Sequence, residues 1–404
     1  METAQHKMSI ASAEWKRMIA IHPPNYICVR RKSPAKSQKT NTEYTPLHLD
    51  GKLDKEEWAH VEWSNVFQDI EGPQKLPKAH VKTRFKMMYD DQFLYIGAEL
   101  EESKLWGTYT IQNSRMYDEN DFEVFLNPDG TRHNYYELEM NCLNTIWELV
   151  LHKPYKDGHA LTNPYNLHST KSAVHLQGDV NAPGSECSKW SIEVRYALDE
   201  LVQFDTIRNR LMRAGDVWRV NYSRVQYELE TVNDNGIPRY VKKPNCREDN
   251  IVWAPTGVID IHRPEKWGIV FFASDSCHST GSLEFQDTQE RYLNEQLAIE
   301  RVLDTIYYEQ REFYAKHAKY ATCLDELRGF KVDTDAPQAS DSPSMDLYTE
   351  LEDDFKRFAP RITIGATTEH VGKRENEYCA SISTATEEWN ILQDGKLWPT
   401  CCSP

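Results

Sequence analysis

Six acidic residues lie close together in the first half of the sequence. They are Asp118, Glu119, Asp121, Glu123, Glu137 and Glu139. Residues two apart in an extended strand share one face, so Asp121 and Glu123 would hold their carboxyl groups about 7 Å apart. That separation falls within the roughly 5–9.5 Å between the two carboxyl groups of a glycosidase. Acidic residues at the start of a strand more often bind water, a structural cation or a sugar hydroxyl, so catalysis is the less favoured interpretation.

The same acidic cluster offers ligands to Ca²⁺, which takes several oxygen atoms from carboxylates and carbonyls. We take Asp118 and Asp121 as its candidate ligands. The EF-hand spacing is absent, so the pattern does not define the remaining ligands.

Five further polar residues lie within or near predicted strands. They are Asn141, Asn144, Asn221, Arg195 and Arg224. Buried amides and guanidinium groups need hydrogen-bond partners. Either these side chains satisfy one another, or they face a ligand and bind sugar hydroxyls in pairs. The sequence leaves both interpretations open.

Several chemistries have no signature in this chain. GxGxxG and Walker-type loops are absent, which argues against a nucleotide cofactor. GxSxG and HExxH are absent too. The nine cysteines show no CxxC or Cys/His metal spacing, and they do not form a disulfide pattern.

The net charge and the hydropathy pattern exclude other partners. A net charge of −16 disfavours nucleic-acid binding, which depends on a cationic surface. No stretch approaches the roughly 20 apolar residues of a membrane span, so we expect no membrane partner. We see no secretory signal, which makes an intracellular location the default expectation and leaves secretion open. Nothing in the sequence indicates an oligomeric state.

Alternating apolar and polar residues predict a series of strands. The strands that we predict span 81–87, 93–100, 121–126, 136–140, 145–151, 190–196, 216–227 and 267–272. Turn-forming runs such as Asn127-Pro128-Asp129-Gly130 separate them. Many strands without helical crossovers favour an antiparallel β-sandwich over a parallel sheet.

The last third of the chain has a different pattern. Apolar residues at steps of three and four predict one long amphipathic helix over 287–317, followed by a short helix over 323–328. The Asp-, Pro- and Ser-rich stretch 333–344 predicts a loop or linker. Three short strands are predicted, at 361–364, 378–383 and 389–392, and Asp394-Gly395 predicts a hairpin turn.

Nine runs of the sandwich region carry a family resemblance. They are LDGKLD at 49–54, MYDDQFLYI at 88–96, NDFEVFLNPDG at 120–130, NYYELE at 134–139, KPY at 153–155, WSIEV at 190–194, WRVNYSRV at 218–225, WAPTG at 253–257 and PEKWG at 264–268. In this order they resemble the family-nine carbohydrate-binding modules, and more closely the family-nine-like proteins of bacteria that degrade polysaccharides. The resemblance covers about 47–272. Residues 307–327 and the strands after them are more faintly similar to the globular part of type IV pilin-like proteins, without their apolar N-terminal anchor.

The resemblance implies a sandwich of the DOMON-like, jelly-roll type that binds glucan or xylan chain ends or small sugars, often with bound calcium. Such modules accompany xylanases and related hydrolases of polysaccharide breakdown and are not hydrolytic themselves. We therefore expect non-catalytic carbohydrate binding. Two alternatives remain: a glycoside hydrolase acting on O-glycosyl bonds, and a structural sandwich that has lost its ligand.

The resemblance also implies site residues. Tyr117 takes the position of an aromatic wall, and Glu123 that of a polar contact. The second wall is expected just before Trp267-Gly268, where this chain has His262 in place of a clear Trp. The remaining candidates for the carbohydrate site are Trp253 and Trp106, as substitutes for that wall, and the polar strand residue Asn141.

The expected organisation has four parts. Residues 1–44 form a mobile polar extension with one short helix around Trp15, and residues 45–274 form the sandwich. A helical segment follows over 275–335. Residues 336–404 form a linker and a small appendage.

Overall fold

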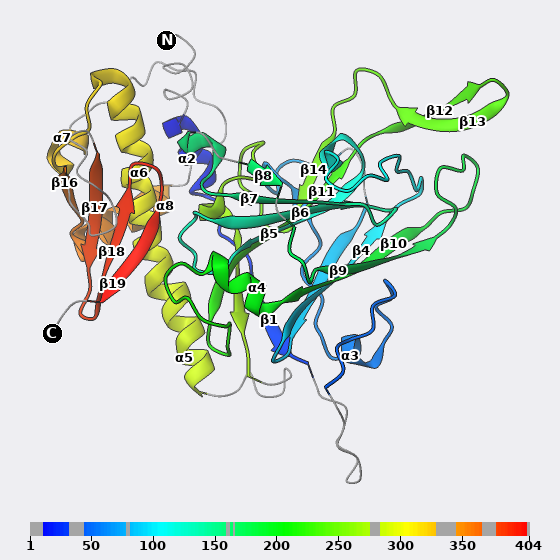
Figure 1. Ribbon diagram of the computed structural model, residues 1–404. Helices are drawn as coiled ribbons and strands as arrows, with labels where there is room; N and C mark the ends of the chain where they lie inside the picture. Colours follow the sequence, from blue (N-terminus) through cyan, green and yellow to red (C-terminus); the bar gives the residue numbers. More distant parts are fainter. Residues whose placement is uncertain are drawn as a thin grey trace, which may run out of the picture.

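The computed structural model describes residues 11–31, 44–77, 81–158, 162–164, 166–274, 283–328, 345–365 and 377–401. Among these, thirteen strands form one large mixed sheet. They are β1 (Asn25–Arg30), β2 (Gln68–Asp69), β3 (Thr83–Tyr89), β4 (Phe93–Glu101), β5 (Asp121–Asn127), β6 (Tyr135–Asn141), β7 (Ile146–Leu151), β8 (Thr162–Pro164), β9 (Lys171–Gln177), β10 (Lys189–Ala197), β11 (Val217–Gln226), β14 (Asp249–Val252) and β15 (Gly268–Phe272). A separate hairpin, β12 (Leu229–Asp234) with β13 (Ile237–Lys242), extends away from them (Figure 1).

The large sheet folds over into two layers. Its strand order is β8-β7-β6-β5-β11-β15-β1-β3-β4-β10-β9, with β14 and β2 branching from β11. Side chains alternate between the two faces of a strand. One main hydrophobic core collects the inward positions of both layers, including Phe85, Ile96, Val124, Leu138 and Val194. The predicted β-sandwich is therefore confirmed, and its predicted strands lie within one or two residues of their predicted positions.

Strand β1 lies in the part of the chain that we predicted to be a polar extension. It pairs in parallel with β15 on one side and with β3 on the other, and so joins the two layers. Its apolar residues Tyr26 and Cys28 point into the main core, while Arg30 and Arg31 pair with acidic residues of the sandwich. This six-residue strand was not predicted because the basic residues at its end made the segment look like a polar extension. The helix predicted around Trp15 is α2 (Ala11–Met18).

The C-terminal part combines helices with a four-stranded antiparallel sheet. Its helices are α5 (Leu283–Arg291), the π-helical turn η5 (Tyr292–Gln296), α6 (Leu297–His317), α7 (Leu324–Arg328) and α8 (Met345–Phe358), and its strands are β16 (Arg361–Ile364), β17 (Tyr378–Ser383), β18 (Glu387–Leu392) and β19 (Leu397–Cys401). The long helix, the short helix, the three short strands and the hairpin turn are confirmed; α8 had no counterpart in the prediction. The predicted linker 333–344 lies outside the described residues.

Helix α6 lies between the small sheet and the sandwich (Figure 1). It forms a second core with α2 and with β17 and β18, through residues such as Trp15, Ile306, Ala380 and Ile391. On the outer face of the large sheet, Ile269 and Phe271 of β15 are buried against Tyr292. The C-terminal part therefore covers one end of that outer face. Among the described helices, none is long and apolar enough to cross a membrane.

The remaining short elements lie in loops of the sandwich. They are α3 (Glu56–Ala59), α4 (Leu198–Leu201) and the 3-10 turns η1 (Met116–Asp118), η2 (Tyr155–Asp157), η3 (Val202–Phe204) and η4 (Pro264–Lys266). Three of these turns, η1, η2 and η4, carry or adjoin residues that surround the candidate site.

Candidate functional site

The other end of the outer face carries a row of polar side chains across four strands. Strand register places Trp147 of β7 beside Glu139 of β6, Glu139 beside Glu123 of β5, and Glu123 beside Ser223 of β11. Directly opposed residues of antiparallel strands hold their Cβ atoms about 4.5–5.5 Å apart. The pairing therefore places the side chains of Glu123 and Glu139 side by side, an arrangement that is unfavourable when both are ionised.

Two more carboxyl groups flank this row. Asp121 precedes Glu123 by two residues on β5, and Glu137 precedes Glu139 by two on β6, so all four share the outer face. All four are buried. One carboxylate oxygen each from Asp121, Glu123 and Glu139 lies within 4.8 Å of the other two, an arrangement that could hold a metal ion.

Burial raises the pKa of each of these carboxyl groups. It brings the pKa of Glu123 to about 7. Burial, with the nearby charge of Glu123, brings the pKa of Glu137 to about 8 and holds those of Asp121 and Glu139 well above their ordinary values. Desolvation and like charge both penalise the ionised form.

An open cavity of about 230 Å³ lies above the row. Glu123, Glu137, Glu139 and Ser223 contribute to its lining, together with Tyr117 and His262 at its sides. The structure thus brings together three of the six candidate carbohydrate residues: Tyr117, Glu123 and His262.

Tyr117 forms one wall of the cavity. It belongs to the turn η1. Its backbone N–H donates to Glu139 Oε2 at 3.0 Å, which holds the turn against strand β6. The Tyr117 carbonyl accepts a hydrogen bond from the Tyr227 hydroxyl at 2.9 Å. Its ring lies 5.7 Å from that of Trp147 and remains 40% exposed. An exposed ring held at its backbone is a suitable platform for an apolar ligand face.

His262 lines the same cavity and lies in the loop before η4. Its Nδ1 is 2.8 Å from the Tyr135 hydroxyl, and its ring meets the ring of Tyr155 edge to face at 4.6 Å. Burial lowers the pKa of His262 to about 4, so the imidazole is neutral at neutral pH. Tyr155 itself is 49% exposed. At the position where the resemblance implies a second wall, the chain thus has a histidine in contact with two tyrosines.

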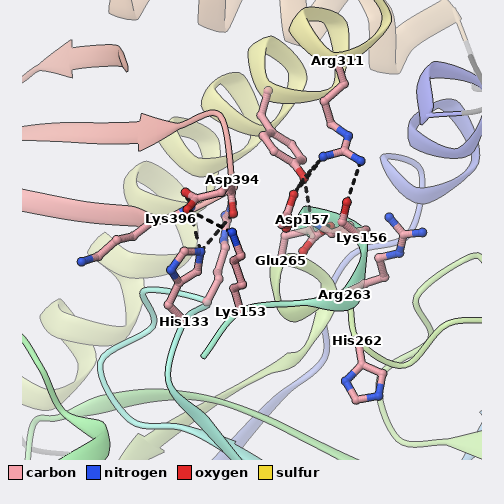
Figure 2. A network of polar contacts seen from close by, with 12 residues as sticks. His133, Lys153, Lys156, Asp157, His262, Arg263, Glu265, Arg311, Asp394 and Lys396 are labelled. Carbon is pink, nitrogen blue, oxygen red and sulfur yellow. Dashed lines mark hydrogen bonds and ion pairs between the residues drawn. The ribbon is translucent and has the colours of Figure 1, made fainter. Parts of the chain in front are cut away.

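A buried polar network anchors both loops behind this wall (Figure 2). In the Tyr155 loop, Lys156 Nζ lies 3.4 Å from Glu265 Oε1, and Asp157 accepts a hydrogen bond from Arg311 of α6 at 2.9 Å. In the His262 loop, Glu265 accepts a hydrogen bond from the Tyr308 hydroxyl of α6. Figure 2 shows the His262 ring pointing away from this network.

The other predicted site residues lie elsewhere. Trp253 is packed in the main core, with its ring 4.9 Å from Phe85, and Trp106 packs against Tyr240 beneath the β12–β13 hairpin. Neither Trp253 nor Trp106 lines the cavity. Asp118 pairs with Arg115 at 3.1 Å and is outside the group of three carboxylates.

Four of the five polar strand residues bond to groups of the protein itself, whereas Arg195 lies over the Phe93 ring with its Nε buried and unpaired. Asn141 donates to the Tyr109 carbonyl at 2.9 Å and accepts from the Leu143 amide, so it shapes the turn after β6. Asn221 bonds the backbone of Ala254, and Arg224 pairs with Glu102 on the other face of the sheet.

Sequence reasoning passed over Trp147, Tyr155 and Ser223. The strand alternation contained one usable signal, because Trp147 and Glu139 both occupy outward positions of neighbouring strands. Tyr155 stands in one of the runs that carry the resemblance, but its place beside His262 depends on the packing of two loops more than 100 residues apart.

Comparisons with known proteins agree with the sequence resemblance. Residues 49–170 match the family model described as carbohydrate family 9 binding domain-like, which confirms the predicted resemblance over that range. Among curated proteins, none matches this chain.

Several solved structures are similar to this chain. A candidate carbohydrate-binding protein from Bacteroides uniformis is 13% identical, with a TM-score of 0.42, and the match covers 62% of this chain and 99% of that one. A family 9 carbohydrate-binding module from Caldicellulosiruptor kristjanssonii in complex with cellotriose is 17% identical, with a TM-score of 0.38, covering 64% and 97%. The same kind of module in complex with glucose is 17% identical, with a TM-score of 0.37, covering 63% and 97%.

Proposed function

We propose that this chain binds carbohydrate without transforming it, through the cavity between Tyr117 and His262. The observation that carries this proposal is an exposed aromatic ring beside a floor of carboxylates in one open cavity. Sugar rings have an apolar face of C–H groups, which packs on an aromatic ring, and hydroxyl groups, which donate to carboxylates in strong, charge-assisted hydrogen bonds. The family match over residues 49–170 supports the same class of ligand.

The size of the cavity favours a small ligand or one end of a chain. About 230 Å³ is below the roughly 300–1,000 Å³ of pockets that enclose drug-sized ligands. We therefore propose a glucan- or xylan-type oligosaccharide bound by its terminal unit, in a process linked to polysaccharide breakdown.

Calorimetric titration with glucose, cellobiose, cellotriose and xylobiose tests this function. Replacing Tyr117 with Ala removes the stacking surface, which is worth about 1–1.5 kcal/mol, so we expect the affinity to fall about tenfold. Tyr117→Phe keeps the ring and should bind nearly as the unaltered protein does. Ile237→Ala, at an exposed position of the β12–β13 hairpin, is the matched control and should leave the affinity unchanged. Absence of binding across the panel, with and without Ca²⁺, would contradict the proposal.

Hydrolysis of O-glycosyl bonds is the second candidate, because Glu123, Glu137 and Glu139 line the same cavity. Glu123 and Glu139 are cross-strand neighbours on one face, so both approach a bound sugar from the same side. A glycosidase instead places its two carboxyl groups so that they flank the bond to be broken. Release of the leaving group from aryl glycosides, lost in Glu123→Gln, would favour hydrolysis over binding alone.

The third alternative, a sandwich without a ligand, predicts a cavity filled by the protein's own side chains. The open space beside the exposed Tyr117 ring argues against that alternative.

A further inference from the structure

The carboxyl groups of the cavity floor differ from their acidic neighbours in having no cationic partner. Asp118 pairs with Arg115, and Glu102 pairs with Arg224. Within the described residues, no Lys, Arg or His forms an ion pair with Glu123, Glu137 or Glu139, which line the cavity, or with Asp121, which adjoins them on β5. Buried charges in proteins are normally paired with an opposite charge or coordinate a metal.

The spacing of three of these groups fits a single ion. One oxygen each from Asp121, Glu123 and Glu139 lies within 4.8 Å of the other two. Two oxygens bound to one Ca²⁺ at about 2.3–2.6 Å can be at most about 5 Å apart. The register of β5 and β6 imposes this closeness, because Glu123 lies directly opposite Glu139.

Unpaired oxygens at the same place are a second, independent observation. Asp121 Oδ1 accepts from the Val225 amide at 3.1 Å, yet Asp121 Oδ2 is buried without a hydrogen-bond partner. Glu137 Oε2, in the lining of the cavity, is also buried without a partner. An unsatisfied buried acceptor costs about 1–3 kcal/mol, which coordination to a cation would remove.

We propose that Asp121, Glu123 and Glu139 bind a divalent cation at the floor of the cavity, and that sugar hydroxyls complete its coordination from the open side. An all-oxygen, carboxylate-rich donor set selects hard cations, and Ca²⁺ accepts the irregular, many-oxygen shell that three carboxylates and two hydroxyls provide. The role of the hydroxyls rests on the proposed carbohydrate binding; the cation site does not.

This site differs from the calcium site expected from the sequence. Asp121 belongs to both, but Asp118 is replaced by Glu123 and Glu139, whose side chains the sheet brings together. Asp118→Asn is therefore a matched control for Asp121→Asn, since each removes one charge from the same acidic segment.

Direct titration of the full chain, after removal of metals with EDTA, tests the cation site. We expect Ca²⁺ to bind in a one-to-one ratio by calorimetry, and Tb³⁺ to give luminescence sensitised by the nearby Tyr117 and Trp147 rings. Asp121→Asn and Glu139→Gln should each weaken Ca²⁺ binding about a hundredfold, because the ligand charge falls. Both variants keep the oxygen that accepts the Val225 or Tyr117 amide, and circular dichroism checks that they fold. Asp118→Asn should bind like the unaltered protein.

The outcomes separate this proposal from the proposed function. Absence of Ca²⁺, Mn²⁺ and Tb³⁺ binding, or binding that survives in both Asp121→Asn and Glu139→Gln, overturns the cation site. Sugar affinity that is equal in EDTA and in Ca²⁺ overturns the role of the hydroxyls and leaves carbohydrate binding standing. If the protein binds the cation but no sugar of the panel, the proposed function is contradicted and the cation site stands. If EDTA abolishes sugar binding and Ca²⁺ restores it, the cation site and the role of the hydroxyls are both supported.

Discussion

At the scale of single residues, the wall at His262 depends on its neighbours more than on the imidazole itself. The Tyr135 hydroxyl fixes the ring orientation through Nδ1, and Tyr155 packs against the ring edge to face. Phe125 supports the same ring from the sheet, with 5.8 Å between centroids. A neutral, fully supported imidazole acts as a flat, weakly polar surface. His262 therefore contributes shape and ring contact to the cavity, and no positive charge.

This arrangement predicts an unusually acidic histidine. Burial disfavours the imidazolium, so the ring protons of His262 should titrate with a midpoint near pH 4, whereas exposed histidines titrate near about 6.5. A pH series of NMR spectra measures this midpoint, and the resonance is assigned by its loss in His262→Gln. A midpoint near 6.5 would mean that the His262 ring is solvated and is not buried beside the cavity.

Three of the candidate residues line one cavity, and all three are positions that the family resemblance implies. Tyr117 and Glu123 lie six residues apart in one motif, and His262 precedes the Trp267-Gly268 pair. Trp253 and Trp106 were reasonable candidates by residue type, but ring type does not reveal burial, and both pack inside hydrophobic clusters. The pairing of Glu123 with Glu139 requires the register of β5 against β6, which no local pattern specifies.

At the scale of elements, helix α6 determines where the wall of the cavity lies. Tyr308 and Arg311 of this helix reach across to Glu265 and Asp157, one in each wall loop. Lys156 and Glu265 also connect the two loops directly. Because the ion pairs are buried, removing one partner leaves uncompensated charge and costs far more than at the surface. The C-terminal part is therefore structurally coupled to the cavity, although none of its described residues lines it.

Replacing Glu265 with Gln should destabilise the protein by about 3–5 kcal/mol, because Lys156, Arg132 and Arg263 lose their shared counter-charge. Urea denaturation at pH 7 measures this loss. Glu388→Gln is the control, since its ion pair with Arg361 is exposed and should be worth less than about 1 kcal/mol.

The same residue gives a defined pH dependence. These cations lower the pKa of Glu265 to about 2, from 4.5 in the unfolded chain. A depressed carboxyl pKa stabilises the native state above pH 4.5, and this contribution is lost as the pH falls toward 2. The stability difference between the unaltered protein and Glu265→Gln should therefore shrink across that interval. A difference that stays constant down to pH 2 would contradict the role given to Glu265.

At the scale of the whole molecule, β1 turns two layers into one continuous sheet. It lies between β15 and β3 and is parallel to both. Helix α2, just before it in the chain, packs on α6 through Trp15, whose ring stacks on that of Tyr308 at 4.8 Å. The N-terminal segment thus connects both sandwich layers and the C-terminal part. Its short, mixed-polarity sequence explains why pattern analysis assigned it to an extension.

Hydrogen exchange should reveal this central position. Residues 25–28 of β1 pair with β15 and residues 29–30 pair with β3, so we expect the amides that these pairings protect to exchange roughly 100-fold more slowly than those of the β12–β13 hairpin. Exchange followed by mass spectrometry measures both segments in one experiment. The hairpin is the internal reference, because it is hydrogen-bonded but exposed. Equal exchange rates in the two segments would place β1 outside the stable sheet.

The position of β1 also has a consequence for the time at which the chain can finish folding. Its residue Asn25 is synthesised roughly 240 residues before its partner Ile269 on β15. At about 5–20 residues per second, a ribosome needs about 12–50 s to cover that distance. During that interval the first strand of the sheet has no partner on its β15 side. A nascent chain that must wait so long with an open strand edge is a natural client for chaperones that shield unpaired strands.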